Sequence, residues 1–341
     1  MIKKIPVKNV MPQLPKLQSG FSLVELMVAI ALGVFLVLGV TNILFSGQQS
    51  FNATTRIARV QENGQLAKNM LIDDLKRARY MGPNIELQNL AGTTGPVAAV
   101  PTACNSGDNT WGRMVTQGLS GIDNGQINNT VYQCITTINP NNSGAYVQGD
   151  ILTVRYASPW QATAFNAQAL YIRSTFTNSW IFTGNNVNNA ANDEQSSGIA
   201  GVNDTDPINS THELITHSYY VGDSTRQCAG EPISSLFRVR LTSGIPRTEE
   251  IFPGIEDFQV QFSPDGINYF NANNVPDVDG DGSPWNDVVA TQIWLLAKSE
   301  CPEGGFTDND GTRQMPTGVN LPAPGDGHRR QLYTSIISHR N

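Results

Sequence analysis

One uninterrupted apolar run dominates the hydrophobic pattern of this chain. It extends from Phe21 to Phe45, and its 25 residues carry one formal charge, that of Glu25. A helix needs about 20 apolar residues to cross a bilayer, so the run predicts a transmembrane helix. Four lysines and no acidic residue lie in the first 20 positions. This asymmetry predicts that the N-terminal flank stays in the cytoplasm and that the long C-terminal part is exported.

A one-sided apolar pattern then continues the helix beyond the membrane. The segment Ser46–Arg79 contains no proline, and its apolar residues recur at spacings of three, four and seven. These residues are Ile57, Val60, Ala67, Leu71, Leu75 and Ala78. The pattern predicts an amphipathic helix, which Gly82-Pro83 ends. We therefore expect residues 21–45 to lie in a membrane or filament core, and residues 46–82 to pack against a head formed by residues 83–341.

The head is predicted to consist of strands and long loops. Residues 84–149 are rich in Gly, Asn, Thr and Pro, with short candidate strands at Val97–Val100 and Val131–Thr137. Clearer strands follow at Ile151–Tyr156, Ala169–Phe176, Ser179–Thr183, Leu214–Val221, Leu236–Leu241, Phe258–Phe262, Val288–Ala297 and Gln331–Ser338. One long N-terminal helix followed by strands, with no amphipathic helix between them, predicts an α+β fold in which the helix packs on an antiparallel β-sheet.

Four cysteines lie beyond the membrane segment, and none is part of a Cys-x-x-Cys motif. An even number of widely spaced cysteines in an exported domain favours disulfides over metal or redox chemistry. Three pairings are possible. The pairing that keeps both loops local, Cys104–Cys134 with Cys228–Cys301, is the one we expect; the alternative is that one or more cysteines stay free.

One acidic loop is a candidate metal site. Carboxylates at positions one, three and five with glycine at position six form the opening of a calcium-binding loop. The candidate ligands are Asp277, Asp279, Asp281, Ser283 through its backbone carbonyl, and Asp287. Position twelve, which is normally a bidentate glutamate, is Val288, and no helices are expected on either side. The alternative interpretation is a solvated acidic turn between two strands.

No pattern of catalytic residues is present. The sequence has no Gly-x-Ser-x-Gly, phosphate-loop or dinucleotide motif, and its four histidines lack ligand spacing. The acidic pairs Glu249-Glu250 and Glu256-Asp257 are expected on exposed strand ends. The basic group His328-Arg329-Arg330 is likewise expected at a solvated strand end. No enzyme is predicted.

The residues at the start of the apolar run resemble a known signal. Gly20-Phe21-Ser22-Leu23-Val24-Glu25, placed between a basic leader and an apolar helix, resembles the class III signal of type IV prepilins and of type II secretion pseudopilins. The resemblance implies that prepilin peptidase cuts between Gly20 and Phe21, and that the new N-terminus is methylated. Residues 1–20 would then be a leader peptide.

The same resemblance gives Glu25 a role in assembly. A charged residue within a membrane segment costs about 2.5–3.5 kcal/mol. On the pattern alone, Glu25 could also reach the head-group region and do nothing. The resemblance implies that it neutralises the α-ammonium of Phe21 on a neighbouring subunit, because two charges that are costly alone become tolerable as a pair.

Weaker similarity extends over most of the remaining chain. Residues 74–82, 149–156, 254–262 and 332–337 resemble the PilW family of minor pilins, which are assembly and priming subunits and not catalysts. The resemblance implies a pilin-like fold and favours calcium at the acidic loop, since related chains commonly carry a similar one.

Localisation and partners follow from this resemblance. The chain is expected in the inner membrane with one span and a periplasmic head, and then in the pilus at the cell surface. Its expected partners are prepilin peptidase, other minor pilins, the major pilin and a PilY-type tip adhesin. Alternatives are a minor pseudopilin of type II secretion and an exported pilus-tip adhesin.

Net charge agrees with these expectations. The chain has 22 basic and 29 acidic residues, a net charge of −7, and loss of the four leader lysines gives −7 − 4 = −11. Such a charge argues against broad nucleic-acid binding. The composition of 15% charged residues, with 31 Gly and 19 Pro, suits a loop-rich exported β domain better than a cytosolic enzyme.

Overall fold

A computed structural model describes residues 20–83, 90–94, 109–124, 144–175, 178–192, 210–308, 315–316 and 325–339. Two of the predicted strands, Val97–Val100 and Val131–Thr137, lie outside the described residues. The chain divides into two compact units, Met1–Thr54 and Thr55–Asn341. The first unit holds the apolar part of the helix, and the second holds the strands.

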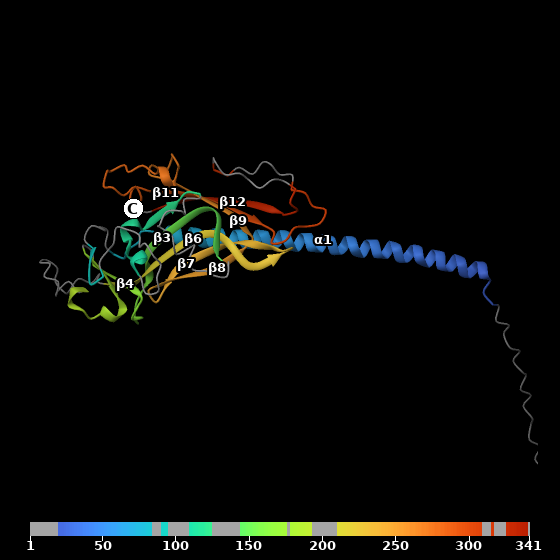
Figure 1. Cartoon of the computed structure of the whole chain (residues 1–341), viewed down its shortest axis with the longest axis horizontal. Helices are drawn as coiled ribbons and strands as arrows, with labels where there is room; N and C mark the ends of the chain where they lie inside the picture. Colours follow the sequence, from blue (N-terminus) through green and yellow to red (C-terminus); the bar gives the residue numbers. More distant parts are fainter. Residues whose placement is uncertain are drawn as a thin grey trace, which may run out of the picture. The chain divides into compact units, whose positions relative to one another are not determined.

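The first unit contains the N-terminal part of the helix α1, which spans Leu23–Arg77 without a break (Figure 1). This span is close to the predicted limits of Phe21 and Arg79. Its most apolar window has a mean hydropathy of 2.7, and none of that window is buried within the chain. By length and composition, this is a helix that can cross a membrane.

The second unit begins in the same helix and contains the strands of the head. Within the part of the chain that the structure describes, eight strands form one sheet and four form another. The larger sheet has β1 (Leu90–Ala91), β2 (Leu119–Ile122), β3 (Ala145–Gln161), β4 (Leu170–Ser174), β5 (Ser179–Thr183), β6 (Ser210–Cys228), β7 (Glu231–Thr242) and β8 (Ile245–Pro253). The smaller sheet has β9 (Ile255–Ser263), β10 (Phe270–Asn271), β11 (Ala290–Lys298) and β12 (Arg330–Ser338).

Short 3-10 turns connect several of the strands. They span Thr110–Arg113, Val115–Gln117, Gly184–Asn186, Ala190–Asn192 and Ala272–Asn274. No strand pair is parallel among the described residues except β1 with β5, which meet over two residues. The α+β class with antiparallel sheets is therefore confirmed.

Strand β6 organises the larger sheet. It is 19 residues long and pairs with β3 along one side. Along its other side it pairs first with β4, through Ser210–Glu213, and then with β7, from His217 onwards. The order of the smaller sheet is β10-β9-β11-β12, with every neighbour antiparallel.

The predicted apolar stripe of α1 forms part of the core of the head. Val60, Ala67, Leu71 and Leu75 are buried and cluster with side chains of both sheets. Those partners include Val154 and Tyr219 of the larger sheet, and Phe258, Ile293 and Ile337 of the smaller one. Because one helix face contacts both sheets, burial of that face holds the two sheets together.

A glycine on this helix face allows close packing of β12. An added Cβ at Gly64 would lie 2.2 Å from Cε2 of Tyr333. The Tyr333 hydroxyl donates to the carbonyl oxygen of Gln61 at 3.1 Å, and the Lys68 ammonium lies 5.8 Å from the ring centroid. Glycine costs about 1 kcal/mol of helix propensity, so its place here is explained by the aromatic ring that occupies the space of a side chain.

The helix ends where backbone conformation and capping require it. Arg79 has a φ of 71° and Gly82 a φ of 87°, in the left-handed region that does not continue a helix. The imidazole Nδ1 of His339 lies 3.1 Å from the carbonyl oxygen of Leu75, one of the last carbonyls of the helix. The helix therefore ends at Arg77, before Gly82-Pro83, and the left-handed conformation of Arg79 ends it rather than the predicted stop.

The strand β8 was missed by the sequence pattern. Its residues Ile245–Pro253 are mostly half-buried, and they include two prolines and two glutamates. The strand pairs only with β7 among the described residues, so it receives no second neighbour that would select for alternating apolar side chains.

Candidate functional site

The processing signal lies at the start of α1, in the first unit. Phe21 is 87% exposed and Glu25 is exposed as well. The backbone N–H of Ser22 donates to the Glu25 carboxylate at 3.3 Å, and the N–H of Leu26 donates to the Ser22 carbonyl oxygen. Ser22-x-x-Glu25 therefore has the form of a capping box, in which a glutamate satisfies the N–H at the helix start. The carboxylate that the resemblance assigns to assembly thus also begins the helix.

A buried polar cluster joins the helix to the larger sheet. The Asp74 carboxylate accepts hydrogen bonds from the Tyr156 hydroxyl at 2.8 Å and from the Tyr219 hydroxyl at 2.5 Å. Nδ1 of His217 lies 2.5 Å from the same carboxylate. We call Asp74, Tyr156, His217 and Tyr219 the Asp74 cluster. Only 5% of Asp74 is exposed, so three side chains of the sheet replace the water that this carboxylate loses on folding.

The pKa values in this cluster indicate a charged Asp74. Burial raises the pKa of Asp74, but the hydrogen bond and charge of His217 and the two tyrosine hydroxyls outweigh it, so that the pKa lies below its ordinary value. Burial and the nearby Asp74 charge raise the pKa of Tyr156 and of Tyr219. The tyrosines therefore stay protonated as donors, and Asp74 stays an acceptor.

The sequence carries a signal for this cluster in the position of Asp74. Asp74 stands three residues after Leu71 and four before Ala78 on the apolar stripe of the helix. A carboxylate at a stripe position is expected to be buried and paired. The identity of its partners could not be foreseen, because they lie on strands that are 82 to 145 residues away in the sequence.

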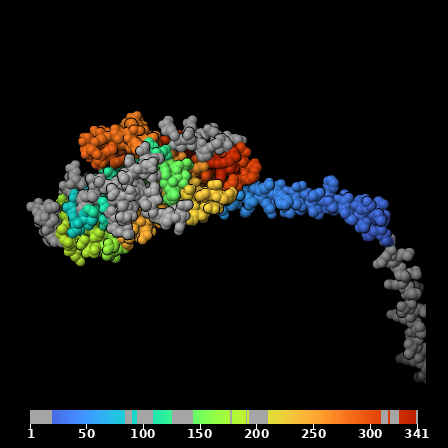
Figure 2. Space-filling model, viewed as in Figure 1, coloured from blue at the N-terminus to red at the C-terminus, as the bar shows by residue number. Residues whose placement is uncertain are grey.

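The acidic loop lies between the 3-10 turn Ala272–Asn274 and β11, as predicted, and belongs to the orange region at the surface in Figure 2. Carboxylate oxygens of Asp277, Asp279 and Asp287 all lie within 4.8 Å of one another. Backbone N–H groups hold them: Gly280 and Gly282 donate to Asp277, and Val278 donates to Asp287 at 2.6 Å. Oxygen-rich groups of this kind fit a hard divalent cation, so these residues can hold a metal ion.

The other two candidate ligands lie differently. The Asp281 carboxylate accepts from the N–H of Ser283 at 2.7 Å and from the amide of Asn286 at 2.9 Å. The Asn286 amide and the Ser283 N–H lower the pKa of Asp281. The structure thus brings together three of the five predicted ligands and directs Asp281 towards its own turn.

Arg79 connects the acidic loop to the end of the helix. Its guanidinium donates to the carbonyl oxygen of Val288 at 2.8 Å and to that of Asn286. These two carbonyls flank Asp287. The conformation of the loop is therefore coupled to the backbone that follows α1 directly.

The predicted Cys228–Cys301 disulfide is present, with an S–S distance of 2.03 Å and a Cα–Cα distance of 5.5 Å. It joins the end of β6 to the segment after β11, and so links the two sheets. The other predicted pair, Cys104 and Cys134, lies outside the described residues.

Two predictions of exposed charge are wrong. Glu256 and Asp257 are 6% and 5% exposed, because β9 is an inner strand of its sheet and faces the larger sheet. The Arg330 side chain is 3% exposed and pairs with Glu256 at 2.6 Å and with Asp326. Charged residues at a strand end are expected to be exposed to solvent. Here Arg330 and Glu256 neutralise each other inside the head.

Two family models match parts of this chain. The model of a prokaryotic N-terminal methylation motif matches residues 15–41, which contain Gly20, Phe21 and Glu25. The model of the type IV pilus-assembly protein W matches residues 218–341, from β6 through β12. The chain thus combines a prepilin-type methylation motif with a PilW-type C-terminal region. Of the four segments in which the sequence resembles this family, residues 254–262 and 332–337 lie within the match, whereas residues 74–82 and 149–156 lie outside it.

The chain was also compared with solved structures and with curated proteins. A solved type IV-like pilin from Thermus thermophilus aligns with this chain at 16% identity, over 56% of this chain and 78% of the pilin, with a TM-score of 0.26. The curated proteins contain no match to the chain. The acidic loop, the Cys228–Cys301 bridge and the Arg330 ion pairs all lie within the PilW-type region 218–341.

Proposed function

We propose that this chain is a minor pilin of the PilW family that initiates assembly of a type IV pilus, at or near the filament tip, together with other minor pilins. The observation that carries the proposal is the combination of a methylation motif with a helix whose most apolar window is not buried by any of the described residues. Such a surface needs lipid before assembly and the helices of other subunits after it. Prepilin peptidase would cut between Gly20 and Phe21.

In this proposal Glu25 sets the register of the incoming subunit. Before cleavage its carboxylate accepts the N–H of Ser22. After cleavage, the free α-ammonium of Phe21 on a neighbouring subunit offers a stronger, charged partner. An unpaired Glu25 in the apolar filament core would cost about 2.5–3.5 kcal/mol, which corresponds to a factor of roughly 70 to 400 in an assembly equilibrium.

The test is incorporation of full-length variants into filaments in the native host. E25A is expected to be processed normally, because the cut site is unchanged, and to be at least tenfold depleted from sheared filaments. V24A is the matched control, since it shortens a neighbouring apolar side chain without a change in charge. Wild-type incorporation of E25A would exclude the proposed role of Glu25. Absence of the wild-type chain from purified pili would contradict the proposed function itself.

We further propose that the acidic loop binds Ca²⁺ through Asp277, Asp279 and Asp287. Support comes from the three carboxylates within 4.8 Å and from the backbone N–H groups that hold them in place. Calcium would then stiffen the loop that Arg79 connects to the end of the helix. The melting temperature of the protein in detergent is expected to fall in chelator and to recover with Ca²⁺. D279N should remove both responses, whereas D265N, in a turn outside the loop, should keep them. An unchanged melting temperature in chelator would exclude the site.

A further inference from the structure

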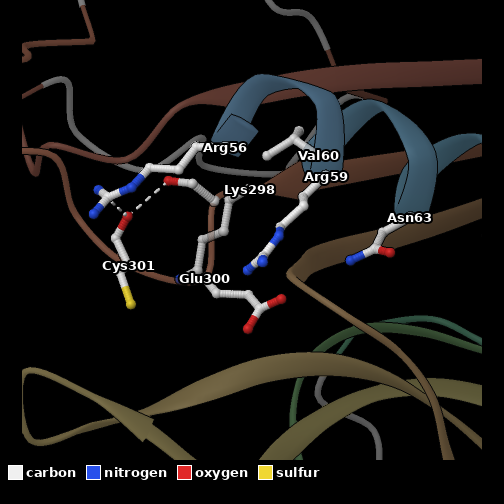
Figure 3. Close-up of a pocket in the computed structure, with 8 residues that line it drawn as sticks. Arg56, Arg59, Val60, Asn63, Lys298, Glu300 and Cys301 are labelled. Atoms are coloured by element: carbon white, nitrogen blue, oxygen red, sulfur yellow. Dashed lines mark hydrogen bonds between the residues drawn. The ribbon is translucent and has the colours of Figure 1, made fainter. Parts of the chain in front are cut away.

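A cavity beside the helix has walls of unusual charge for this acidic protein. Its volume is about 170 Å³, and it lies between α1 and the segment that follows β11. The charged residues that line it are Arg56, Arg59, Lys298 and Glu300. Three cations against one carboxylate stand out in a chain of net charge −7. We call this cavity the basic socket (Figure 3).

The walls of the basic socket are held in place by other contacts. Arg56 donates to the carbonyl oxygen of Pro302 at 2.7 Å and to that of Cys301 at 3.4 Å. The disulfide of Cys301 with Cys228 anchors the same segment to β6. On the helix side, the Asn63 amide donates to the carbonyl oxygen of Pro253 at 3.1 Å. A ligand would therefore meet preformed walls and would not pay for their ordering.

One cation in the socket has no acceptor. Figure 3 shows the Arg59 side chain extending from the helix into the space in front of Lys298 and Glu300. Lys298 pairs with Glu256 at 3.2 Å, and Glu300 pairs with Arg226 at 3.6 Å. Within the described residues, by contrast, no hydrogen bond or ion pair involves the Arg59 guanidinium. An acidic group that enters the socket would meet Arg59 directly, with Arg56 and Lys298 lining the same cavity.

We propose that the basic socket receives an acidic side chain, Asp or Glu, of a neighbouring pilin subunit. The inference rests on the proposed function, because it requires that heads of different subunits meet in a filament. Size favours this occupant: about 170 Å³ holds one side chain but not a nucleotide or a folded segment. The planar guanidinium of Arg59 matches a carboxylate in a bidentate arrangement. Where Glu25 would set the register of a subunit at its N-terminus, the socket would select the partner at the base of the head.

The first test compares charge variants of the full-length chain in the native host. R59E is expected to lower the amount of the subunit in filaments about tenfold, because a carboxylate partner would then face a like charge. R59K should fall between R59E and the wild type, because it keeps the charge but loses the bidentate arrangement. K76E is the matched control: it makes the same change of charge on an exposed residue of the same helix, away from the socket, and should be close to the wild type. Equal incorporation of R59E and K76E would overturn the proposal.

Folding is controlled separately. The melting temperatures of R59E, K76E and the wild type in detergent are expected to agree, since Arg59 has no partner within the described chain. If R59E melts lower, R59Q replaces it, and the same comparison with K76Q decides. Absence of all variants, the wild type included, from filaments would contradict the proposed function and not the socket alone.

The second test identifies the occupant. R59K places a primary amine in the socket, which a water-soluble carbodiimide couples to an adjacent carboxylate with formation of an amide and release of a urea. In purified filaments, mass spectrometry is expected to find the amine of R59K joined to an Asp or Glu of another pilin. A cross-link to Glu300 of the same chain alone would show that the socket is closed by its own acid. No intersubunit cross-link in filaments that contain R59K would likewise refute the proposal.

Discussion

The most direct test of the structure is removal of the carboxylate at the centre of the Asp74 cluster. D74A would leave the hydroxyls of Tyr156 and Tyr219 and Nδ1 of His217 without their acceptor in a buried site. A hydrogen bond to a charged group contributes about 1.5–3 kcal/mol, and the three share one carboxylate, so their energies do not add. Loss of one partner from a buried charged network typically costs about 3–5 kcal/mol. We expect this loss for D74A.

Two further substitutions separate charge from packing. D74N keeps the shape of the side chain and one carbonyl acceptor, so we expect a smaller loss of about 1–2 kcal/mol. D73A is the matched control on the same helical turn. Asp73 is exposed, and substitutions at such sites usually stay within about 0.5 kcal/mol.

The assay is thermal or denaturant unfolding of the full-length protein in detergent, followed by tryptophan fluorescence. All five tryptophans lie beyond residue 110, in the second unit, so the signal reports on the head. The second unit, Thr55–Asn341, has an unfolding entropy of about 0.6 kcal/mol/K at about 2.1 cal/mol/K per residue, so a loss of about 3–5 kcal/mol lowers the melting temperature by roughly 5–8 °C. A D74A protein whose stability is within 1 kcal/mol of D73A would show that the cluster does not hold the helix to the sheet.

The pH dependence of this difference follows from the lowered pKa of Asp74. A carboxylate whose folded pKa lies below its unfolded value stabilises the protein at higher pH, and the stabilisation is lost as the pH falls through the folded value. The unfolded reference is 3.8. The difference in stability between the wild type and D74N should therefore persist at neutral pH and shrink below about pH 4. A difference that grows on acidification would contradict this assignment of charge.

Three other substitutions test the remaining features of the head. G64A places a methyl group against the Tyr333 ring and should destabilise the head by about 1–3 kcal/mol, despite the gain in helix propensity, as denaturant unfolding would show. Burial raises the pKa of Asp150 to about 7. The stability that protonated Asp150 contributes is therefore fully present below the unfolded pKa and is lost as the pH rises through about 7. The melting temperature of D150N should depend less on pH between 5 and 8 than that of the wild type. The double variant C228S/C301S opens a loop with a sequence separation of 73 and should lose about 4 kcal/mol, measured against the wild type under oxidising conditions.

The sequence predicted those features that depend on residues close to one another along the chain. The helix α1 was predicted to within two residues at each end, because its apolar pattern is local. Strands with alternating or continuous apolar residues, such as β5 and β9, were also found. Strand β8 was not, since its half-buried residues carry no such pattern.

The parts that escaped prediction depend on contacts between distant segments. Arg330 was expected in solvent, yet it is buried because Glu256 lies beside it, 74 residues earlier in the chain. No role was predicted for Gly64, because no local feature of the sequence indicates that the Tyr333 ring of β12 occupies the space where a side chain would lie. Of the acidic loop, the sequence predicted the location and the three gathered carboxylates, but not the turn that directs Asp281 towards Asn286.

The packing of β12 on the helix has a consequence for the order of events during folding. Tyr333 and His339 contact helix backbone groups at sequence separations of 272 and 264 residues. The stripe is synthesised long before β12, so the side that β12 covers stays open until β12 has been made. Contacts of such long range are slow to form. The core of the head is therefore complete only after β12 has docked on the helix, and a chain shortened before β12 would expose that side of the stripe.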